Sequence, residues 1–259
     1  MYHLDTTLPK FWNNLSFLSS CELKIETPTC TTNATIDLSS AHLTDGTFTI
    51  PGAGLTLETA SFSEIYSTFD PLKVTLISQS RELKLSLRPS DDQALPKLHA
   101  ICAAYASETT SQNFKVPGVV TPGLCPCCIE AARIRVRQIT RNPLTAILAD
   151  AALRSNALLV SVQSKDGCFS SAHLPAHLLQ NDSCLISEGF GSRFEINIRH
   201  LHAMKLTTEM IDGKSHRSLE LMNSLGNTTN KVSAPADQIK EAWVQILGRR
   251  NHCYDIISP

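Results

Sequence analysis

The chain has 259 residues, of which 42% are hydrophobic and 18% charged, so it can bury a large core and is neither disordered nor fibrous. Its 23 Lys and Arg residues balance 24 Asp and Glu residues, and this net charge of −1 argues against a nucleic-acid partner. The nine cysteines exclude a complete set of internal disulfides, because nine is an odd number.

The N-terminal end predicts a protein of the cytoplasm. Residues 1–5 lack the basic and apolar regions of a signal peptide, and no stretch reaches the roughly 18 apolar residues of a membrane helix. We therefore expect no membrane insertion and reduced thiols. Six scattered cysteines are interpreted as small buried side chains of the fold, namely Cys21, Cys30, Cys102, Cys168, Cys184 and Cys253.

The sequence contains an internal repeat. The pentapeptide Ser-Ser-Ala-His-Leu at residues 39–43 recurs unchanged at residues 170–174. A helix-like run precedes each copy, strand-like alternation follows it, and helix-like runs close the two halves at residues 95–105 and 237–247. A duplication explains this order, and it predicts one shared structural role for His42 and His173.

Turn signals between the strand-like segments predict antiparallel hairpins. Asp45-Gly46 and Asp212-Gly213 are two such signals. We therefore expect an α+β fold, a tandem duplication of an antiparallel-sheet unit flanked by helices. Its parts are an N-terminal repeat over residues 1–109, a linker over residues 110–142 and a C-terminal repeat over residues 143–259.

The linker carries the clearest chemical signal. Cys125-Pro126-Cys127-Cys128 precedes a predicted helix over residues 129–138, and Arg133, Arg135 and Arg137 lie on that helix. Soft thiol ligands and cations thus fall within about two helical turns. Such a pattern favours metal binding, cofactor binding or thiol redox chemistry over a purely structural turn.

The second half resembles the HemS/HmuS/ChuS family of intracellular haem-utilisation proteins, also called hemin-degrading factors. The resemblance spans about ninety residues, and its motifs are Leu158 to Cys168 leading to His173, Leu185 to Phe190, Phe194 to Asn197, Arg199-His200-Leu201-His202, Ser218 to Leu221 with Gly226, Asn230-Lys231-Val232, and Trp243. The resemblance implies a duplicated α+β fold and a cytoplasmic protein that carries or degrades imported haem. It also implies a haem importer or a haem-accepting protein as partner.

This sequence departs from the family at the iron ligand. The resemblance implies a histidine between the two repeats, yet the chain has none between His99 and His173. Cys125 stands in that segment, and a thiolate followed by proline is a good ligand for ferric iron. We therefore predict Cys125 as the haem ligand. Three arginines would pair with the haem propionates and raise the thiolate fraction, namely Arg133, Arg135 and Arg137.

Other chemistry stays open for the cysteine cluster. Cys125, Cys127 and Cys128 supply at most three thiolates to zinc or an iron–sulfur cluster, so His200 or His202 would complete the set. The adjacent pair Cys127 and Cys128 alternatively suits thiol redox chemistry. In these cases the protein would be a regulatory or binding module.

Three further residues are candidate contacts to haem or a metal. We expect His200 and His202 on one strand, where residues two apart share a face. They would then line the site, or else form a polar row on the wet side of a sheet. Lys231 would meet a propionate or remain a solvated strand lysine. Trp243 lies on an apolar helix face and is expected in the core.

Overall fold

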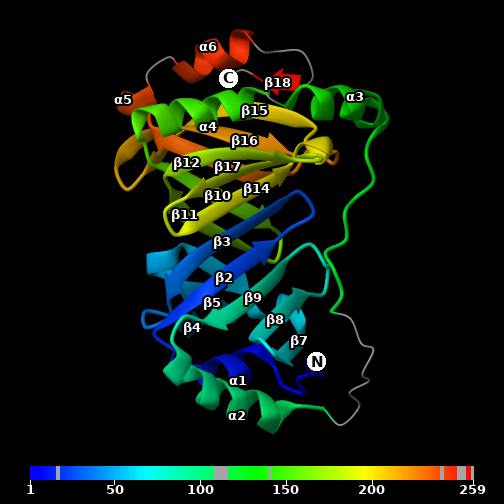
Figure 1. Ribbon diagram of the computed structural model, residues 1–259, viewed down its shortest axis with the longest axis vertical. Coiled ribbons are helices and arrows are strands. Elements are labelled where there is room, and N and C mark those ends of the chain that lie inside the picture. The colour runs from blue at the N-terminus through cyan, green and yellow to red at the C-terminus, as the bar shows by residue number, and fades with distance from the viewer. Residues whose placement is uncertain (16–17, 108–115, 140–141, 240–241, 250–254, 258–259) are drawn as a thin grey trace. The chain divides into compact units, whose positions relative to one another are not determined.

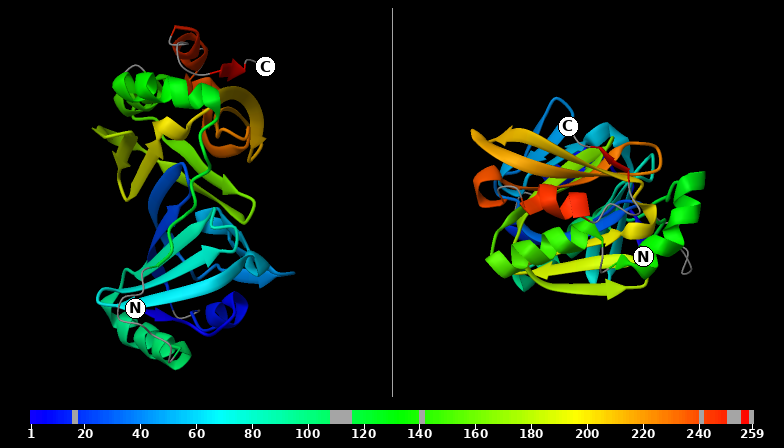
Figure 2. Two further views of the ribbon diagram at one scale, coloured as in Figure 1. Left: turned by 90° about the vertical axis from the view of Figure 1, so that its right-hand side faces the viewer. Right: turned by 90° about the horizontal axis from the view of Figure 1, so that it is seen from above.

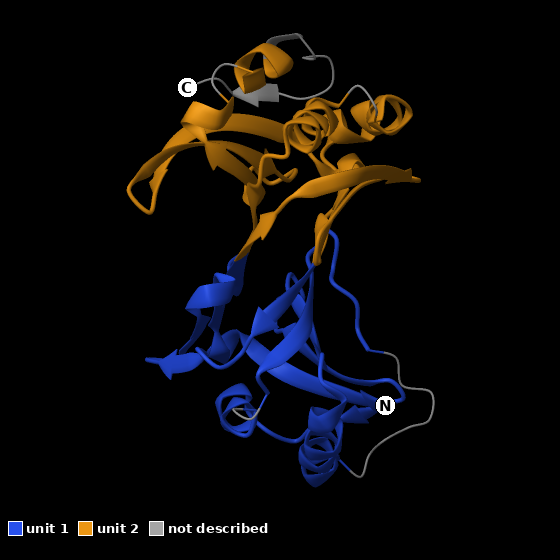
Figure 3. Cartoon of the chain, turned by 60° about the vertical axis from the view of Figure 1, so that its left-hand side comes forward, with its two compact units in different colours: residues 1–28, 33–121, 164–169 blue, residues 29–32, 122–163, 170–259 orange. Residues whose placement is uncertain are grey.

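The computed structural model describes residues 1–15, 18–107, 116–139, 142–239, 242–249 and 255–257 (Figure 1). The chain forms two compact units (Figure 3). Unit 1 comprises residues 1–28, 33–121 and 164–169, and unit 2 comprises residues 29–32, 122–163 and 170–259. Helices lie beside antiparallel sheets in both units, which confirms the predicted α+β class.

The first half of the chain begins with a two-residue strand and a short helix, and it ends with a longer helix. Its elements are β1 (Tyr2–His3), α1 (Leu8–Asn13), β2 (Ser20–Glu26), β3 (Cys30–Asp37), β4 (His42–Thr44), β5 (Thr47–Ile50), η1 (Pro51–Ala53), β6 (Leu55–Glu58), η2 (Thr59–Ser61), β7 (Phe62–Phe69), β8 (Leu72–Ser78), β9 (Lys84–Pro89), η3 (Asp92–Ala94) and α2 (Leu95–Tyr105). The closing helix α2 matches the predicted run over residues 95–105.

The second half begins with two helices. Its elements are α3 (Pro126–Arg137), α4 (Pro143–Arg154), β10 (Leu158–Ser164), β11 (Gly167–His173), β12 (Pro175–Asn181), β13 (Cys184–Gly189), β14 (Ser192–Asn197), η5 (Ile198–His200), β15 (Ala203–Ile211), β16 (Lys214–Met222), β17 (Thr228–Pro235), α5 (Ala236–Ile239), α6 (Ala242–Arg249) and β18 (Asp255–Ile257). Among the described residues, no helix combines the length and apolar character that a membrane crossing needs.

In unit 1 the strands form two hydrogen-bonded groups. The hydrogen-bonded order is β1-β7-β8-β9-β2-β3, and a second group has the order β6-β5-β4. Along β2 the side chains of Leu23 and Ile25 are buried while Lys24 between them is exposed, as alternation along a strand requires. Helix α1 packs Trp12 against Phe48 of β5, with ring centroids 3.9 Å apart.

In unit 2 one antiparallel group has the order β15-β16-β17-β10 and another has the order β14-β13-β12. Strand β18 adds to the free edge of β15 in parallel. Helix α4 packs against β12 and α6 (Figure 2) and buries Leu144, Ile147 and Leu148. Trp243 of α6 is 1% exposed, so the prediction that it lies in the core is confirmed.

The predicted hairpin turns are confirmed by their backbone. Asp45 and Gly46 join β4 to β5 with φ of 49° and 80°, and Asp212 and Gly213 join β15 to β16 with φ of 49° and 75°. Two successive positive φ values give the type I′ turn, whose twist matches that of a hairpin. The short polar Asp and the glycine tolerate this left-handed backbone.

The two halves share one element order, although the repeated pentapeptide does not share one structure. Each half runs through a helix, five strands, a 3₁₀ turn, three strands and a closing helical segment, with short additional elements. Residues 39–43 form a turn and the start of edge strand β4, whereas residues 170–174 lie almost wholly in β11. The parallel order agrees with a duplication, which stays a prediction.

The shared role predicted for His42 and His173 is wrong. His42 is exposed on β4, and its Nδ1 lies 3.3 Å from the Ser40 carbonyl. His173 is 1% exposed, with Nδ1 2.8 Å from Ser192 Oγ and Nε2 2.7 Å from Ser187 Oγ. Burial lowers the pKa of His173 to about 4, so a neutral ring bridges the two serines.

Acid is therefore expected to destabilise the protein through His173. The folded state resists protonation until about pH 4, while the unfolded chain takes the proton near pH 6.5, so stability falls between these values. The loss approaches about 3 kcal/mol at pH 4, from about 1.4 kcal/mol per pKa unit. Urea unfolding of His173→Gln should lack this share of the pH dependence, and His42→Gln should keep it. Equal pH dependence in all three proteins would contradict the assignment.

The scattered cysteines divide into two groups. Cys21, Cys30 and Cys102 are buried, as predicted. Cys184 is half-buried, and Cys168 is exposed because its side chain takes the outer position of β11, so its predicted burial is wrong. Cys253 lies outside the described residues. None of the cysteines in the described part of the chain forms a disulfide.

Candidate metal centre

Helix α3 begins at the cysteine cluster, for local reasons. Cys125 is the N-cap residue with extended backbone, and its carbonyl accepts the first intrahelical bond from the Ile129 N–H at 3.0 Å. Pro126 takes the first helical position, where a missing N–H costs nothing. The Cys-Pro-Cys-Cys run therefore starts the helix and places Cys127 and Cys128 in its first turn.

Three thiols converge on one imidazole in unit 2. The Nδ1 atom of His202 lies 3.4 Å from Cys125 Sγ, 3.6 Å from Cys127 Sγ and 3.3 Å from Cys128 Sγ. The four ligand atoms all lie within 4.8 Å of one another. Cys128 is buried, Cys127 is exposed, and the other two are intermediate, so the cluster has one open side.

The segment before β15 delivers His202 to this place. Asn197 caps the turn η5 by accepting a hydrogen bond from the Arg199 N–H, and α3 packs on that turn. The His202 N–H then donates to the Met222 carbonyl at 2.8 Å. His200 lies on η5 rather than on a strand, so the predicted strand pairing of the two histidines is wrong. His200 is half-buried and is not a member of the converging group.

Arg135 locks the helix to the histidine segment. It is 5% exposed, and its guanidinium donates to the carbonyls of Leu201 and His202 and to Cys128 Sγ at 3.1 Å. From the sequence we grouped Arg135 with two arginines that lie on the surface. Helical periodicity sets Arg135 about 200° from Arg133, on the opposite face of α3. The different position of Arg135 was therefore predictable from the sequence.

The thiols of the cluster differ in acidity. The hydrogen bond from Cys127 is the largest cause that lowers the pKa of Cys125, to about 6, and contacts with Cys128 and His202 act in the same direction. The same bond raises the pKa of Cys127. Burial raises the pKa of Cys128 to about 11, although Arg135 opposes the shift. Cys125 is therefore the most acidic thiol of the three.

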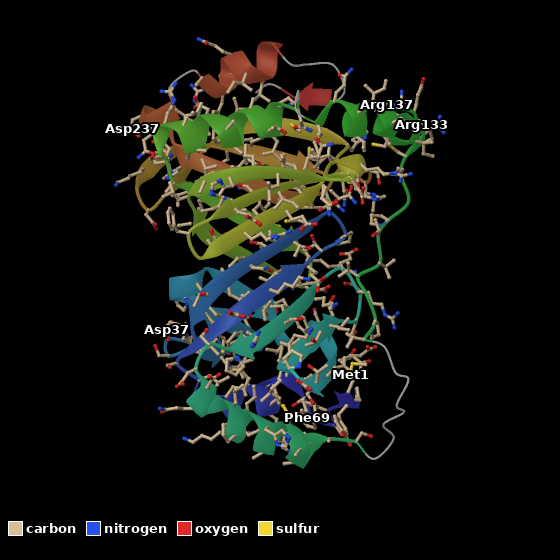
Figure 4. The ribbon with its side chains drawn as sticks, in the orientation of Figure 1. Met1, Asp37, Phe69, Arg133, Arg137 and Asp237 are labelled. Carbon is tan, nitrogen blue, oxygen red and sulfur yellow. The ribbon has the colours of Figure 1, made fainter. Side chains whose placement is uncertain are left out.

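The remaining predicted residues lie around this centre or away from it. Arg133 and Arg137 are exposed and extend outward from α3 (Figure 4). Lys231 on β17 pairs with Glu209 on β15, with Nζ and Oε2 2.9 Å apart. Within the described residues, the structure therefore brings together the three cysteines, His202 and Arg135 from the predicted set.

No protein-family model matches the sequence, and no curated protein matches it either. Solved structures do match. A structure described as the heme degrading enzyme ChuS of Escherichia coli O157:H7 superposes with a TM-score of 0.67 at 11% identity, covering 96% of this chain and 86% of that one. Apo-PhuS, described as a heme-binding protein from Pseudomonas aeruginosa, gives 0.69 at 9% identity, covering 94% and 86%. The chain has the ChuS-type fold.

The ChuS-type fold confirms the resemblance predicted from sequence at the level of architecture. Holo-PhuS also matches, with a TM-score of 0.66 at 8% identity and 95% of this chain covered. At such identities a shared fold does not carry residue roles with it, because function is set by the site and not by the architecture. What this chain binds must be argued from its own cluster.

Proposed function

We propose that the protein binds haem and serves haem and iron utilisation, by carrying imported haem or degrading it. Two proteins that share its fold are described as heme-binding and heme-degrading, which supports haem as the ligand class. The single observation that carries the proposal on this chain is the half-exposed thiol of Cys125, held at the start of α3 where the predicted iron ligand stands. A cytoplasmic location, and a haem importer or haem-accepting protein as partner, belong to the same proposal.

The chemistry of Cys125 suits an axial ligand of haem iron. The N-terminus of a helix favours the thiolate over the thiol, and thiolate is an established ligand of haem. Pro126 contributes no competing N–H at this point. Haem itself would supply the iron and the porphyrin chemistry of oxygen activation. The chain would supply the ligand, a partly open site and the contacts that orient the ring.

The outer face of α3 suits the rest of an amphipathic porphyrin. Ile129 and Ile134 are 63% and 46% exposed, so this face offers apolar surface against which a porphyrin ring could pack. Arg133 and Arg137 share this face of the helix and could pair with propionates by charge-assisted hydrogen bonds. Arg135 already binds Cys128 and two carbonyls, so we assign it the role of positioning the cluster.

Two predicted contacts stay predictions. His200 is half-buried on η5 and could reach a ligand from the side of that turn. Lys231 would have to leave its ion pair with Glu209 to meet a propionate. Neither residue is needed for the thiolate ligation that we propose.

Hemin titration of the reduced, metal-free protein tests the proposal. We expect saturable binding with the Soret band of thiolate-ligated ferric haem. Cys125→Ser should abolish that signature and weaken binding by about tenfold or more, a loss of at least about 1.4 kcal/mol. Cys168→Ser, which removes an exposed thiol outside the cluster, should behave as the wild type. Absence of binding by every form, or an unchanged spectrum in Cys125→Ser, would overturn the assignment.

A second step separates carriage from degradation. When a reductant and oxygen are added to the loaded protein, loss of the Soret band with formation of an open-chain pigment indicates degradation. A Soret band that persists, together with transfer of the haem to an acceptor such as apomyoglobin, indicates carriage.

A further inference from the structure

The ligand atoms of the cysteine cluster surround one point, which a single axial ligand does not require. Three sulfurs from α3 and its N-cap lie between 3.3 and 3.6 Å from His202 Nδ1. We infer that Cys125, Cys127, Cys128 and His202 form a Cys₃His site for zinc. The inference goes beyond haem binding and does not depend on it.

The separations fit a tetrahedral ion. Bonds of about 2.3 Å from zinc to sulfur and about 2.0 Å from zinc to nitrogen place a sulfur and a nitrogen about 3.5 Å apart in a regular tetrahedron. All three sulfur–nitrogen distances lie close to that value. Cys125 Sγ and Cys127 Sγ are 2.8 Å apart, so these two sulfurs would separate by about 1 Å when zinc binds.

The chain geometry lets two adjacent cysteines bind the same ion, which adjacent cysteines seldom do. Cys127 and Cys128 are neighbours in the first turn of α3, yet both thiols reach the same imidazole. They do so because Cys125 lies outside the helix, at its N-cap, and His202 arrives from the segment before β15. The ion would therefore sit beyond the end of the helix rather than against its side.

The surroundings suit a site with excess negative charge. Three thiolates and one neutral imidazole leave a zinc complex with a net charge of −1. The guanidinium of Arg135 donates to Cys128 Sγ, and the positive end of the α3 dipole faces the same sulfurs. Arg135 also binds the carbonyls of Leu201 and His202, so it holds the imidazole segment against the helix.

The donor set selects the metal. Thiolates with one imidazole favour zinc over magnesium, calcium or manganese, which prefer oxygen ligands. Iron–sulfur clusters are held mostly by four thiolates and need space for several irons and sulfides. Four ligand atoms within 4.8 Å of one another fit one ion.

Zinc at this site would also regulate haem binding. Cys125 cannot ligate zinc and haem iron together, so a zinc-loaded protein would withhold the thiolate from haem. This consequence rests on the proposed function, whereas the zinc site does not.

Cobalt(II) titration of the reduced, metal-free protein tests the inference, with cobalt as the spectroscopic probe for zinc. We expect one equivalent to produce a thiolate-to-cobalt charge-transfer band and the intense visible bands of tetrahedral cobalt, and zinc to displace it. His202→Asn and Cys127→Ser should each weaken binding by about a hundredfold or more, because loss of a group that only hydrogen-bonds to a ligand already costs about 10- to 100-fold. Cys127 is exposed, so loss of binding in Cys127→Ser cannot be ascribed to a damaged core. His177→Asn and Cys168→Ser, exposed residues outside the group, are the matched controls.

The outcomes decide the two proposals separately. Absence of a charge-transfer band, or equal binding by His202→Asn and the wild type, overturns the zinc site whatever hemin does. If zinc does bind, hemin added to the zinc-loaded protein should fail to give the thiolate spectrum that the metal-free form gives. Zinc binding without any haem binding would leave the zinc site standing and overturn the haem proposal alone.

Discussion

Replacing Arg135 with methionine is expected to lower the free energy of unfolding by roughly 3 kcal/mol, because it leaves two carbonyl acceptors without their donor at about 1–3 kcal/mol each. Arg135 is 5% exposed and donates to Leu201 and His202, which lie 66 and 67 positions further along the chain. Methionine keeps the apolar volume, so the change isolates the lost hydrogen bonds. Urea unfolding monitored by circular dichroism measures the loss.

The helix provides its own control for this substitution. Arg133→Met removes an exposed cation from the opposite face of α3 and should change stability by no more than about 0.5 kcal/mol. Arg135→Met should also weaken cobalt binding although it removes no ligand, because His202 loses the bond that holds it near α3. Equal, small effects of both substitutions would show that Arg135 is not the link between the helix and the histidine segment.

Zinc is expected to stabilise the folded chain in proportion to its free concentration. A ligand that binds only the folded state adds about 4 kcal/mol at a thousand times its dissociation constant, and about 1.4 kcal/mol for each further tenfold. The added free energy of unfolding should arise in unit 2, because all four proposed ligands belong to that unit. Urea unfolding in zinc buffers of defined free concentration measures the slope.

Two results would contradict the expected stabilisation by zinc. Stability that does not respond to zinc would mean that no ion binds the folded state. An equal response in His202→Asn would mean that zinc binds through surface groups rather than through the cluster. Cys168→Ser should keep the full response of the wild type.

Local chemistry made much of the fold predictable. The Asp-Gly pairs at 45–46 and 212–213 predicted hairpins because few residues tolerate two positive φ values, and the structure has both turns. The apolar spacing of α2 and the burial of Trp243 likewise follow from residues close together in sequence. The conformations of residues 39–43 and 170–174 were not predictable in this way, because identical residues pack in different strand environments.

The candidate site was predictable in its parts but not in its assembly. The sequence identified the three cysteines and named His202 as one of two possible fourth ligands. The sequence does not show whether His200 or His202 is the fourth ligand, because the positions of both depend on the turn η5 and its Asn197 cap. The contact between Cys125 and His202, 77 positions apart, was not predictable either, because it depends on how α3 packs on η5.

Zinc-edge X-ray absorption of the protein loaded with one equivalent of zinc decides whether three thiols and one imidazole form a single metal centre. We predict a first shell of three sulfurs at about 2.3 Å and one nitrogen at about 2.0 Å. His202→Asn should lose the imidazole signal, while His177→Asn should keep it. A shell of oxygen and nitrogen atoms alone, or one with fewer than three sulfurs, would contradict a Cys₃His centre.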